Sequence, residues 1–227
     1  MRSLFKKRNK QTLRGRALLL QPNRLLRSLY PRALWRFNTK KKFICLTFDD
    51  GPIDLSNWVL DELRKVNAKA SFFCVGENVQ KNSTIFERIK AEGHQVANHT
   101  QHHIKGFKTS LADYITEVEA CDAVVGSRYF RPPYGQLRAS QYKSLLKRGY
   151  KIVLWDVISY DYEKISEEQC LSNVLNHARE GSIVLFHDNI KAEKNLRFVL
   201  PKTLEYFSKK GFEFLTLEQA ERAHLLL

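Results

Sequence analysis

The sequence has few of the residues that mark fibrous, disordered or disulfide-bonded proteins. Its 227 residues include 10 Gly, 6 Pro and 4 Cys, and no two cysteines form a CxxC pair. This composition excludes collagen-like and low-complexity chains. Hydrophobic residues make up 43% of the chain, enough for the core of one domain. The cysteines stand singly in apolar or helical stretches, so we expect buried free thiols, which favours a reducing compartment.

Long hydrophobic runs are also missing. The longest apolar run near the N-terminus, residues 17–20, is shorter than the roughly 7 to 15 residues of the apolar region in a secretory signal. No other segment reaches the roughly 20 residues of a membrane-spanning helix. We therefore expect neither a signal peptide nor a transmembrane helix, and a location in the cytoplasm or at the periphery of a membrane.

Acidic residues are absent from the first 42 positions, which hold 14 Lys or Arg and so account for the whole net charge of +14. We divide the chain into a basic arm, residues 1–39, and a globular domain, residues 40–227. The arm could contact an anionic membrane or nucleic acid, or it could pack its leucines, Tyr30 and Trp35 on the domain. No nucleic-acid-binding signature accompanies the charge, which argues against nucleic acid.

From Lys42 onward, short apolar runs alternate with helical patterns. Strands are predicted at residues 43–48, 70–75, 95–97, 129–130, 151–155 and 182–186. Helices are predicted at residues 56–66, 83–92, 110–125, 138–148, 166–179 and 194–210. Regular alternation predicts an α/β fold with a parallel sheet and crossover helices. Six or seven strands in a domain of this size predict a barrel or strongly curled sheet, with the active site at the carboxyl ends of the strands.

Two adjacent carboxylates, Asp49 and Asp50, follow the first predicted strand, where Gly51 and Pro52 turn the chain. Adjacent side chains on a bending chain face different sides of one pocket. One carboxylate can then ligate a metal while the other takes a proton. A surface turn rich in Asp would have much the same sequence, so this pair needs support from other motifs.

Three of the seven histidines fall within five residues, at positions 99, 102 and 103. A helical turn would place His99 and His103 on one face. With one aspartate they form a two-histidine, one-carboxylate set of metal ligands that leaves positions open for water and substrate. We interpret His102 as structural or as part of the rim.

A rigid segment, Arg131-Pro132-Pro133-Tyr134-Gly135, follows the fourth predicted strand. Consecutive prolines fix the backbone. Arg131 can then be held ready to pair with Asp49, and the Tyr134 amide ready to donate to an oxyanion. The alternative interpretation is a stiff connecting loop.

The last long strand ends in His187, which suits an imidazole general acid at the floor of a pocket. Asp161 is the candidate residue that orients this imidazole. Aromatic rings between the motifs suit stacking against sugars or, alternatively, ordinary packing. The predicted lining of a substrate groove is Pro133, Trp155, Tyr162 and Leu185.

Taken in order, these segments resemble the NodB-type polysaccharide deacetylases, carbohydrate esterase family 4, from Lys42 to about Leu217. The motifs that carry the resemblance are residues 47–52, 99–103, 131–135, 161–162 and 185–187. Tyr162, Ile158 and Ile104 stand where many members have Trp, Asp and Pro. These departures affect the groove wall, so they put the substrate in question and leave the catalytic set intact.

The resemblance implies a distorted (β/α) barrel of about seven parallel strands with outer helices. It implies metal-dependent removal of N-acetyl groups from an amino-sugar polymer or oligomer, such as peptidoglycan or chitin. By the family's pattern Asp49 is the general base, Asp50, His99 and His103 bind the metal, Arg131 orients Asp49, and His187 is the general acid supported by Asp161. Zn²⁺ is the first choice of metal, and Co²⁺, Ni²⁺ or Mn²⁺ suit the same ligands.

Two other functions stay open at this point. The chain could hydrolyse a cyclic imide, a ureide or an O-acetyl ester. It could instead be a non-catalytic module that binds glycans or a membrane surface. Retention of both Asp49 and His187 argues against the binding module, which needs neither.

Overall fold

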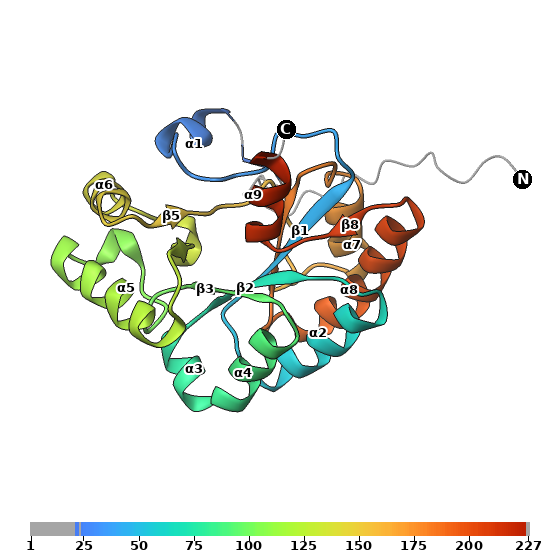
Figure 1. Ribbon diagram of the computed structural model, residues 1–227, viewed down its shortest axis with the longest axis horizontal. Helices are drawn as coiled ribbons and strands as arrows, with labels where there is room; N and C mark the ends of the chain where they lie inside the picture. The colour runs from blue at the N-terminus through green and yellow to red at the C-terminus, as the bar shows by residue number, and fades with distance from the viewer. Residues whose placement is uncertain (1–20, 23, 226–227) are drawn as a thin grey trace, which may run out of the picture.

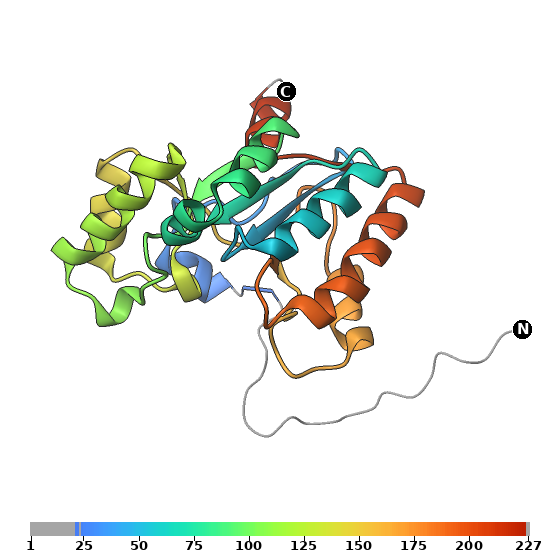
Figure 2. The same cartoon turned by 90° about the horizontal axis from the view of Figure 1, so that it is seen from below.

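A curled sheet of parallel strands forms the centre of the fold, and helices cover its outer side (Figures 1 and 2). The computed structural model describes residues 21–22 and 24–225. The strands are β1 (Phe43–Asp49), β2 (Ala70–Cys74), β3 (Gln95–Asn98), β4 (Tyr129–Phe130), β5 (Lys151–Ile152), β6 (Val157–Ile158), β7 (Ile183–His187) and β8 (Glu213–Phe214). Their order is β5-β4-β3-β2-β1-β7-β6, and β8 pairs with the start of β1. The predicted distorted barrel is confirmed.

Nine α-helices connect or flank these strands within the described residues. They are α1 (Arg24–Leu29), α2 (Asp54–Lys65), α3 (Gly76–Lys81), α4 (Ser83–Ala91), α5 (Leu111–Val125), α6 (Ala139–Lys147), α7 (Glu167–Leu175), α8 (Glu193–Lys209) and α9 (Leu217–Leu225). Two short 3₁₀ turns, Gly106–Lys108 and Pro133–Gly135, complete the elements. Among the described residues, no helix has both the length and the apolar character needed to cross a membrane.

The central strand β1 is buried along its whole length. Burial on both faces is typical of a central strand in a parallel sheet. Its last residue, Asp49, lies beside Phe73 of β2 and His187 of β7 in the register of the sheet. The register therefore brings together two polar motifs that are far apart in sequence.

The predicted strands and helices all form, with bounds that differ by a few residues, except that the strand predicted at 151–155 ends at Ile152. Beyond it, the Val153 N–H still donates to the Phe130 carbonyl of β4 at 2.8 Å, and Val153 forms an isolated bridge with Leu34 of the basic arm. Strands β6 and β8 and helices α1, α3 and α9 were not predicted. All but α9 have only two to six residues, too short a segment to leave a clear hydrophobic period. The four cysteines are buried free thiols, as predicted.

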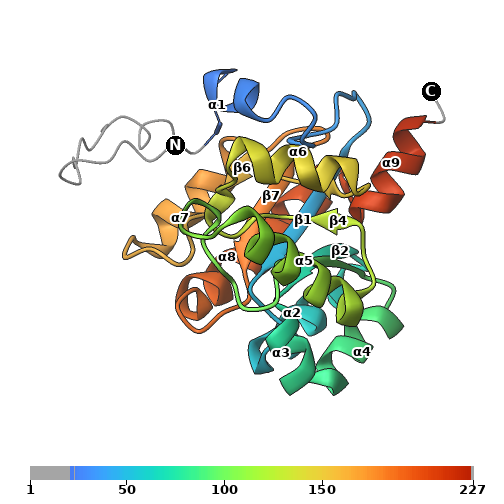
Figure 3. The same cartoon turned by 90° about the vertical axis from the view of Figure 1, so that its left-hand side faces the viewer.

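The described part of the basic arm packs on the domain. The Leu34 N–H donates to the Ile152 carbonyl at 2.8 Å, and the Phe37 N–H donates to the Gly181 carbonyl at 2.8 Å. Tyr30 and Trp35 are buried, and helix α1 lies beside α6, where the Tyr30 and Tyr142 rings are 5.2 Å apart (Figure 3). Residues 34–37 thus join the end of β5 to the segment before β7. Residues 1–20, with the apolar run at 17–20, lie outside the described residues.

A buried ion pair also ties the arm to the domain. Arg27 Nη2 lies 2.7 Å from Asp156 Oδ1, and the Ser182 hydroxyl donates to the other Asp156 oxygen at 2.7 Å. Asp156 is fully buried, whereas the Arg27 side chain is 30% exposed. Arg27 is therefore the cation that offsets a carboxylate removed from water.

Replacing Arg27 by alanine should lower the free energy of unfolding by about 1–3 kcal/mol, because Asp156 would lose its charged partner in a buried setting. The partial exposure of Arg27 keeps the expected loss below that of a fully buried pair. Urea denaturation of the purified protein measures it. Arg32→Ala, at an exposed position of the same arm, should change stability by less than about 0.5 kcal/mol, and an equal loss in both variants would contradict the role of the pair.

Candidate active site

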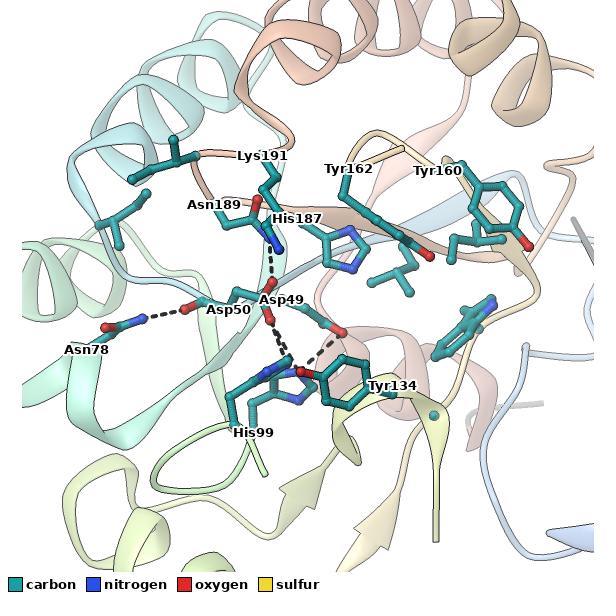
Figure 4. A pocket seen from close by; sticks show the side chains of 17 residues that line it. Asp49, Asp50, Asn78, His99, Tyr134, Tyr160, Tyr162, His187, Asn189 and Lys191 are labelled. Atoms are coloured by element: carbon teal, nitrogen blue, oxygen red, sulfur yellow. Dashed lines mark hydrogen bonds and ion pairs between the residues drawn. The ribbon is translucent and has the colours of Figure 1, made fainter. Parts of the chain in front are cut away.

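The predicted site residues meet at one cavity of about 560 Å³ at the carboxyl ends of the strands (Figure 4). Nine of them line it: Asp49, Asp50, His99, His103, Tyr134, Trp155, Tyr162, Leu185 and His187. Arg131 and Asp161 are buried and support lining residues from behind. Pro133 is buried in its turn and is not among the residues that line the cavity.

Asp50, His99 and His103 form a cluster with the composition of a metal site. One ligand atom from each lies within 4.8 Å of the others. Asp50 Oδ1 is 3.0 Å from His103 Nε2 and 3.5 Å from His99 Nε2. This buried oxygen has no hydrogen-bond partner among the described residues. A carboxylate oxygen without a donor, facing two imidazoles, fits a divalent cation bound between the three side chains.

The electrostatics of the cluster agree with that fit. Burial by itself raises the pKa of Asp50, but the imidazoles of His103 and His99 outweigh burial and hold the pKa well below its ordinary value. Asp50 therefore stays ionised, which is the form that binds a cation.

His99 is oriented by the backbone of a neighbouring motif. Its Nδ1 lies 2.7 Å from the carbonyl oxygen of Arg131. A carbonyl only accepts, so Nδ1 carries the proton and Nε2 presents its lone pair to the cluster. The helical turn expected for residues 99–103 does not form, because Thr100 and His103 have φ angles of +67° and +53°. An irregular loop brings the two rings to a centroid separation of 5.0 Å.

Arg131 holds Asp49 as the sequence predicts. Its Nη1 donates to Asp49 Oδ1 at 2.7 Å and to Thr47 Oγ1 at 2.8 Å. The guanidinium is fully buried and lies 4.0 Å from the centroid of the Phe73 ring. The other Asp49 oxygen, Oδ2, is 3.8 Å from His99 Nε2. One oxygen of Asp49 is thus fixed by arginine while the other faces the cluster.

His187 and Asp161 form the second supported pair. Asp161 Oδ1 is 2.8 Å from His187 Nδ1, and Asp161 Oδ2 accepts the His187 backbone N–H at 2.8 Å. Burial by itself lowers the pKa of His187, but Asp161, and after it Asp50 and Asp49, outweigh burial and raise that pKa from 6.5 to about 9. These carboxylates favour the protonated imidazole, whose Nε2 is then available as a proton donor.

Aromatic side chains form the rim. Tyr134, with φ +60°, is 53% exposed, and its ring centroid lies 4.8 Å from that of His103. Gly135 allows the close approach of Trp155, because a Cβ atom on Gly135 would lie 2.8 Å from the indole. The Tyr162 ring meets His187 edge to face at 4.6 Å. His102 lies apart from the cluster, exposed and paired with Glu117.

The lining residues that were not predicted include Asn78 of α3 and Asn189 in the loop after β7. Both side chains donate to Asp50. Asparagine is common in loops and turns for local reasons, so its presence there carries no signal of a distant contact. The sequence feature that could have pointed to Asn189 is its position directly after His187 and Asp188.

Comparison with known proteins agrees with this geometry. The profile of the family described as polysaccharide deacetylase matches residues 36–153. A peptidoglycan-N-acetylglucosamine deacetylase of Bacillus cereus is 31% identical over 198 residues, which cover 83% of this chain and 92% of that protein. The crystal structure of the Bc1960 peptidoglycan N-acetylglucosamine deacetylase superposes with a TM-score of 0.76 at 31% identity, covering 83% of this chain and 92% of that one.

The fold alone does not decide catalysis. A carbohydrate esterase family 4 pseudoenzyme from Bacillus anthracis has the same fold, with a TM-score of 0.71 at 22% identity over 86% of this chain and 70% of that one. Activity therefore depends on the side chains of the site. With the profile match, the relative's identity and the shared fold, this chain belongs to the polysaccharide deacetylase family.

Proposed function

We propose that this deacetylase removes the N-acetyl group from N-acetylglucosamine units of peptidoglycan, with one Zn²⁺ held by Asp50, His99 and His103. The observation that carries the proposal is the arrangement of two supported proton-transfer groups around these ligands. In Figure 4, His99 and Tyr134 lie on one side of Asp49 and Asp50, and His187 lies on the other. The named activity of the B. cereus relative supports this substrate class.

The roles of the residues follow from their surroundings. A divalent ion bound there supplies a Lewis acid that polarises the acetyl carbonyl and acidifies water. Asp49, held by Arg131, is the base that takes a proton from the attacking water. The Tyr134 backbone amide donates to the oxygen that gains charge. His187, held by Asp161, protonates the leaving nitrogen, so that acetate and a free amine depart.

The rim of the cavity offers a surface for the sugar ring that carries the acetyl group. Trp155, Tyr162 and Leu185 give the cavity an apolar wall next to the polar cluster. Such a wall suits the flat apolar face of a pyranose. Pro133, which does not line the cavity, supports the turn that carries Tyr134.

Acetate release tests the substrate class. Peptidoglycan fragments with N-acetylglucosamine should release acetate at the highest kcat/KM, chitin oligomers should follow, and O-acetylated xylan should react least. If kcat/KM is highest on a cyclic imide, a ureide or the xylan ester, the proposed substrate is wrong. Glycan binding without turnover of any acetylated compound, with any of Zn²⁺, Co²⁺, Ni²⁺ or Mn²⁺, would favour the binding module.

Replacing Asp161 by asparagine should move the basic limb of the kcat–pH profile to lower pH by about 1–3 units. The acid must be protonated to act, so activity falls as pH rises through the pKa of His187. Asp161 raises that pKa, and an uncharged amide would not. A bound cation lowers the pKa of His187 in both proteins. The basic limb therefore lies below the value of about 9 that the carboxylates alone produce. Asp54→Asn, at an exposed position, is the control and should keep the wild-type profile. A basic limb at the same pH in Asp161→Asn and in the wild type would contradict the role of His187 as the acid.

We propose, secondly, that residues 40–227 form the catalytic domain and that the basic arm holds it at an anionic membrane. Within the described part of the arm Arg32 is exposed, and Lys40 and Lys41 at the start of the domain are exposed as well. Anionic lipid attracts each basic residue near its surface by about 1 kcal/mol.

Deleting residues 1–20, which hold 7 Lys or Arg, should therefore sharply weaken binding to phosphatidylserine vesicles at low salt. Turnover of a small soluble substrate should stay unchanged, because the segments that pack on the domain are retained. Vesicle sedimentation measures binding. If the full chain does not sediment with these vesicles, the arm serves packing alone.

A further inference from the structure

Asp50 has a backbone conformation that needs support. Its φ is +85°, in a region that side-chain-bearing residues rarely adopt. Such conformations persist only where the surroundings hold them. The strand ends one residue earlier. The Asp50 N–H still donates to the Phe73 carbonyl of β2 at 3.3 Å, so the sheet holds the Asp50 amide but not its carbonyl or its side chain.

Asn78 holds the backbone of Asp50. Its Nδ2 donates to the Asp50 carbonyl oxygen at 2.7 Å. Asn82, which directly follows α3, donates from Nδ2 to the Pro52 carbonyl at 3.0 Å and to the Asn78 carbonyl at 3.1 Å. The turn after β1 is therefore attached to the segment after β2 by side-chain amides.

Asn189 holds the side chain of Asp50 (Figure 4). Its Nδ2 donates to Asp50 Oδ2 at 2.5 Å, while its Oδ1 accepts the Ala192 N–H at 2.9 Å. The second bond fixes which end of the amide faces Asp50, because only the oxygen can accept from a backbone N–H. Asp50 Oδ2 is thereby occupied, and Oδ1 is the oxygen that faces His99 and His103.

We propose that Asn78 and Asn189 are positioning residues that clamp Asp50 from two sides and present a single carboxylate oxygen to the metal. One amide fixes the strained backbone and the other fixes the rotation of the carboxylate. The clamp comes from two different segments, so the ligand stays in place independently of the loop that carries the histidines. This inference rests on the metal site of the proposed function and deepens it.

Metal affinity is the direct readout. Zn²⁺ dissociation constants, measured by competition with a chromophoric chelator, should rise about 10- to 100-fold in Asn189→Ala, the usual effect of removing a partner of a metal ligand. Asn78→Ala should also weaken binding. Asn176→Ala, at an exposed position that ends α7, is the matched control and should bind as the wild type does.

Thermal unfolding of the metal-free proteins separates positioning from folding. Asn189→Ser should keep the metal-free melting temperature, because serine can still accept from the helix-start N–H. Its side chain is one bond shorter and cannot span both partners, so Zn²⁺ affinity should fall as in Asn189→Ala. Wild-type affinity in Asn189→Ser would overturn the clamp, and so would wild-type affinity in Asn189→Ala. No metal binding by the wild-type chain would instead refute the proposed function itself.

Discussion

Asp49→Asn should lower the turnover of acetate release by about 10²- to 10⁴-fold, the usual contribution of a general base. Asparagine keeps the shape of the side chain and can still accept from Arg131, whose Nη1 lies 2.7 Å from Asp49 Oδ1. It cannot take a proton from water. His187→Ala should cost a similar factor, because the leaving nitrogen would depart without a proton from the enzyme.

Both variants should lose activity while they keep their fold and their metal. Neither residue is a proposed ligand, so Zn²⁺ content should stay near that of the wild type. The KM should change less than kcat, since the lost interactions belong to the transition state. Asp54→Asn, an exposed position at the start of α2, is the control. Turnover within about threefold of the wild type in both active-site variants would contradict the assigned roles.

His99→Ala should abolish metal binding, from about one ion per chain to almost none, and activity should fall with it. The His99 ring is buried, and its Nδ1 is held by the Arg131 carbonyl. Removing it deletes one of the three proposed ligands. Elemental analysis after dialysis against Zn²⁺ measures the content.

The neighbouring His102 provides the matched control. It is exposed and pairs with Glu117, 2.8 Å from its Nδ1, so His102→Ala should keep its metal. Equal metal content in His99→Ala and His102→Ala would remove the Asp50, His99 and His103 set as the binding site.

Much of the site could be predicted because the polar motifs follow predicted strands. Parallel strands end at the same edge of a sheet, which is why Asp49, His99, Arg131 and His187 were expected together before their distances were known. The pairing of Arg131 with Asp49 followed from charge and from the stiffness of the Pro-Pro segment. These inferences needed only strand positions and side-chain chemistry.

The contacts that could not be predicted depend on tertiary structure. Strand β7 lies directly beside β1, although more than a hundred residues separate them, and no periodic pattern encodes that order. The irregular loop from His99 to His103 is set by two positive φ angles at residues other than glycine. The amides of Asn78 and Asn189 reach Asp50 from segments whose local sequence indicates only a short helix or a turn.

The contacts of the basic arm could not be predicted from the sequence either. Composition predicts a charged appendage, and Tyr30 and Trp35 were candidates for packing. The bridges of Leu34 to Val153 and of Arg36 to Ser182 are backbone contacts, which any side chain can make. Nothing in the residue types identifies this segment as the connection between β5 and the start of β7.

Metal-dependent acetate release by the wild-type chain tests the central claim most directly. The purified protein, stripped by a chelator and then given one equivalent of Zn²⁺, should release acetate from an N-acetylglucosamine-containing peptidoglycan fragment and leave one free amine for each acetate. The stripped protein should be inactive on the same fragment. Equal acetate release with and without metal, or none under either condition while Zn²⁺ is bound, would contradict the account.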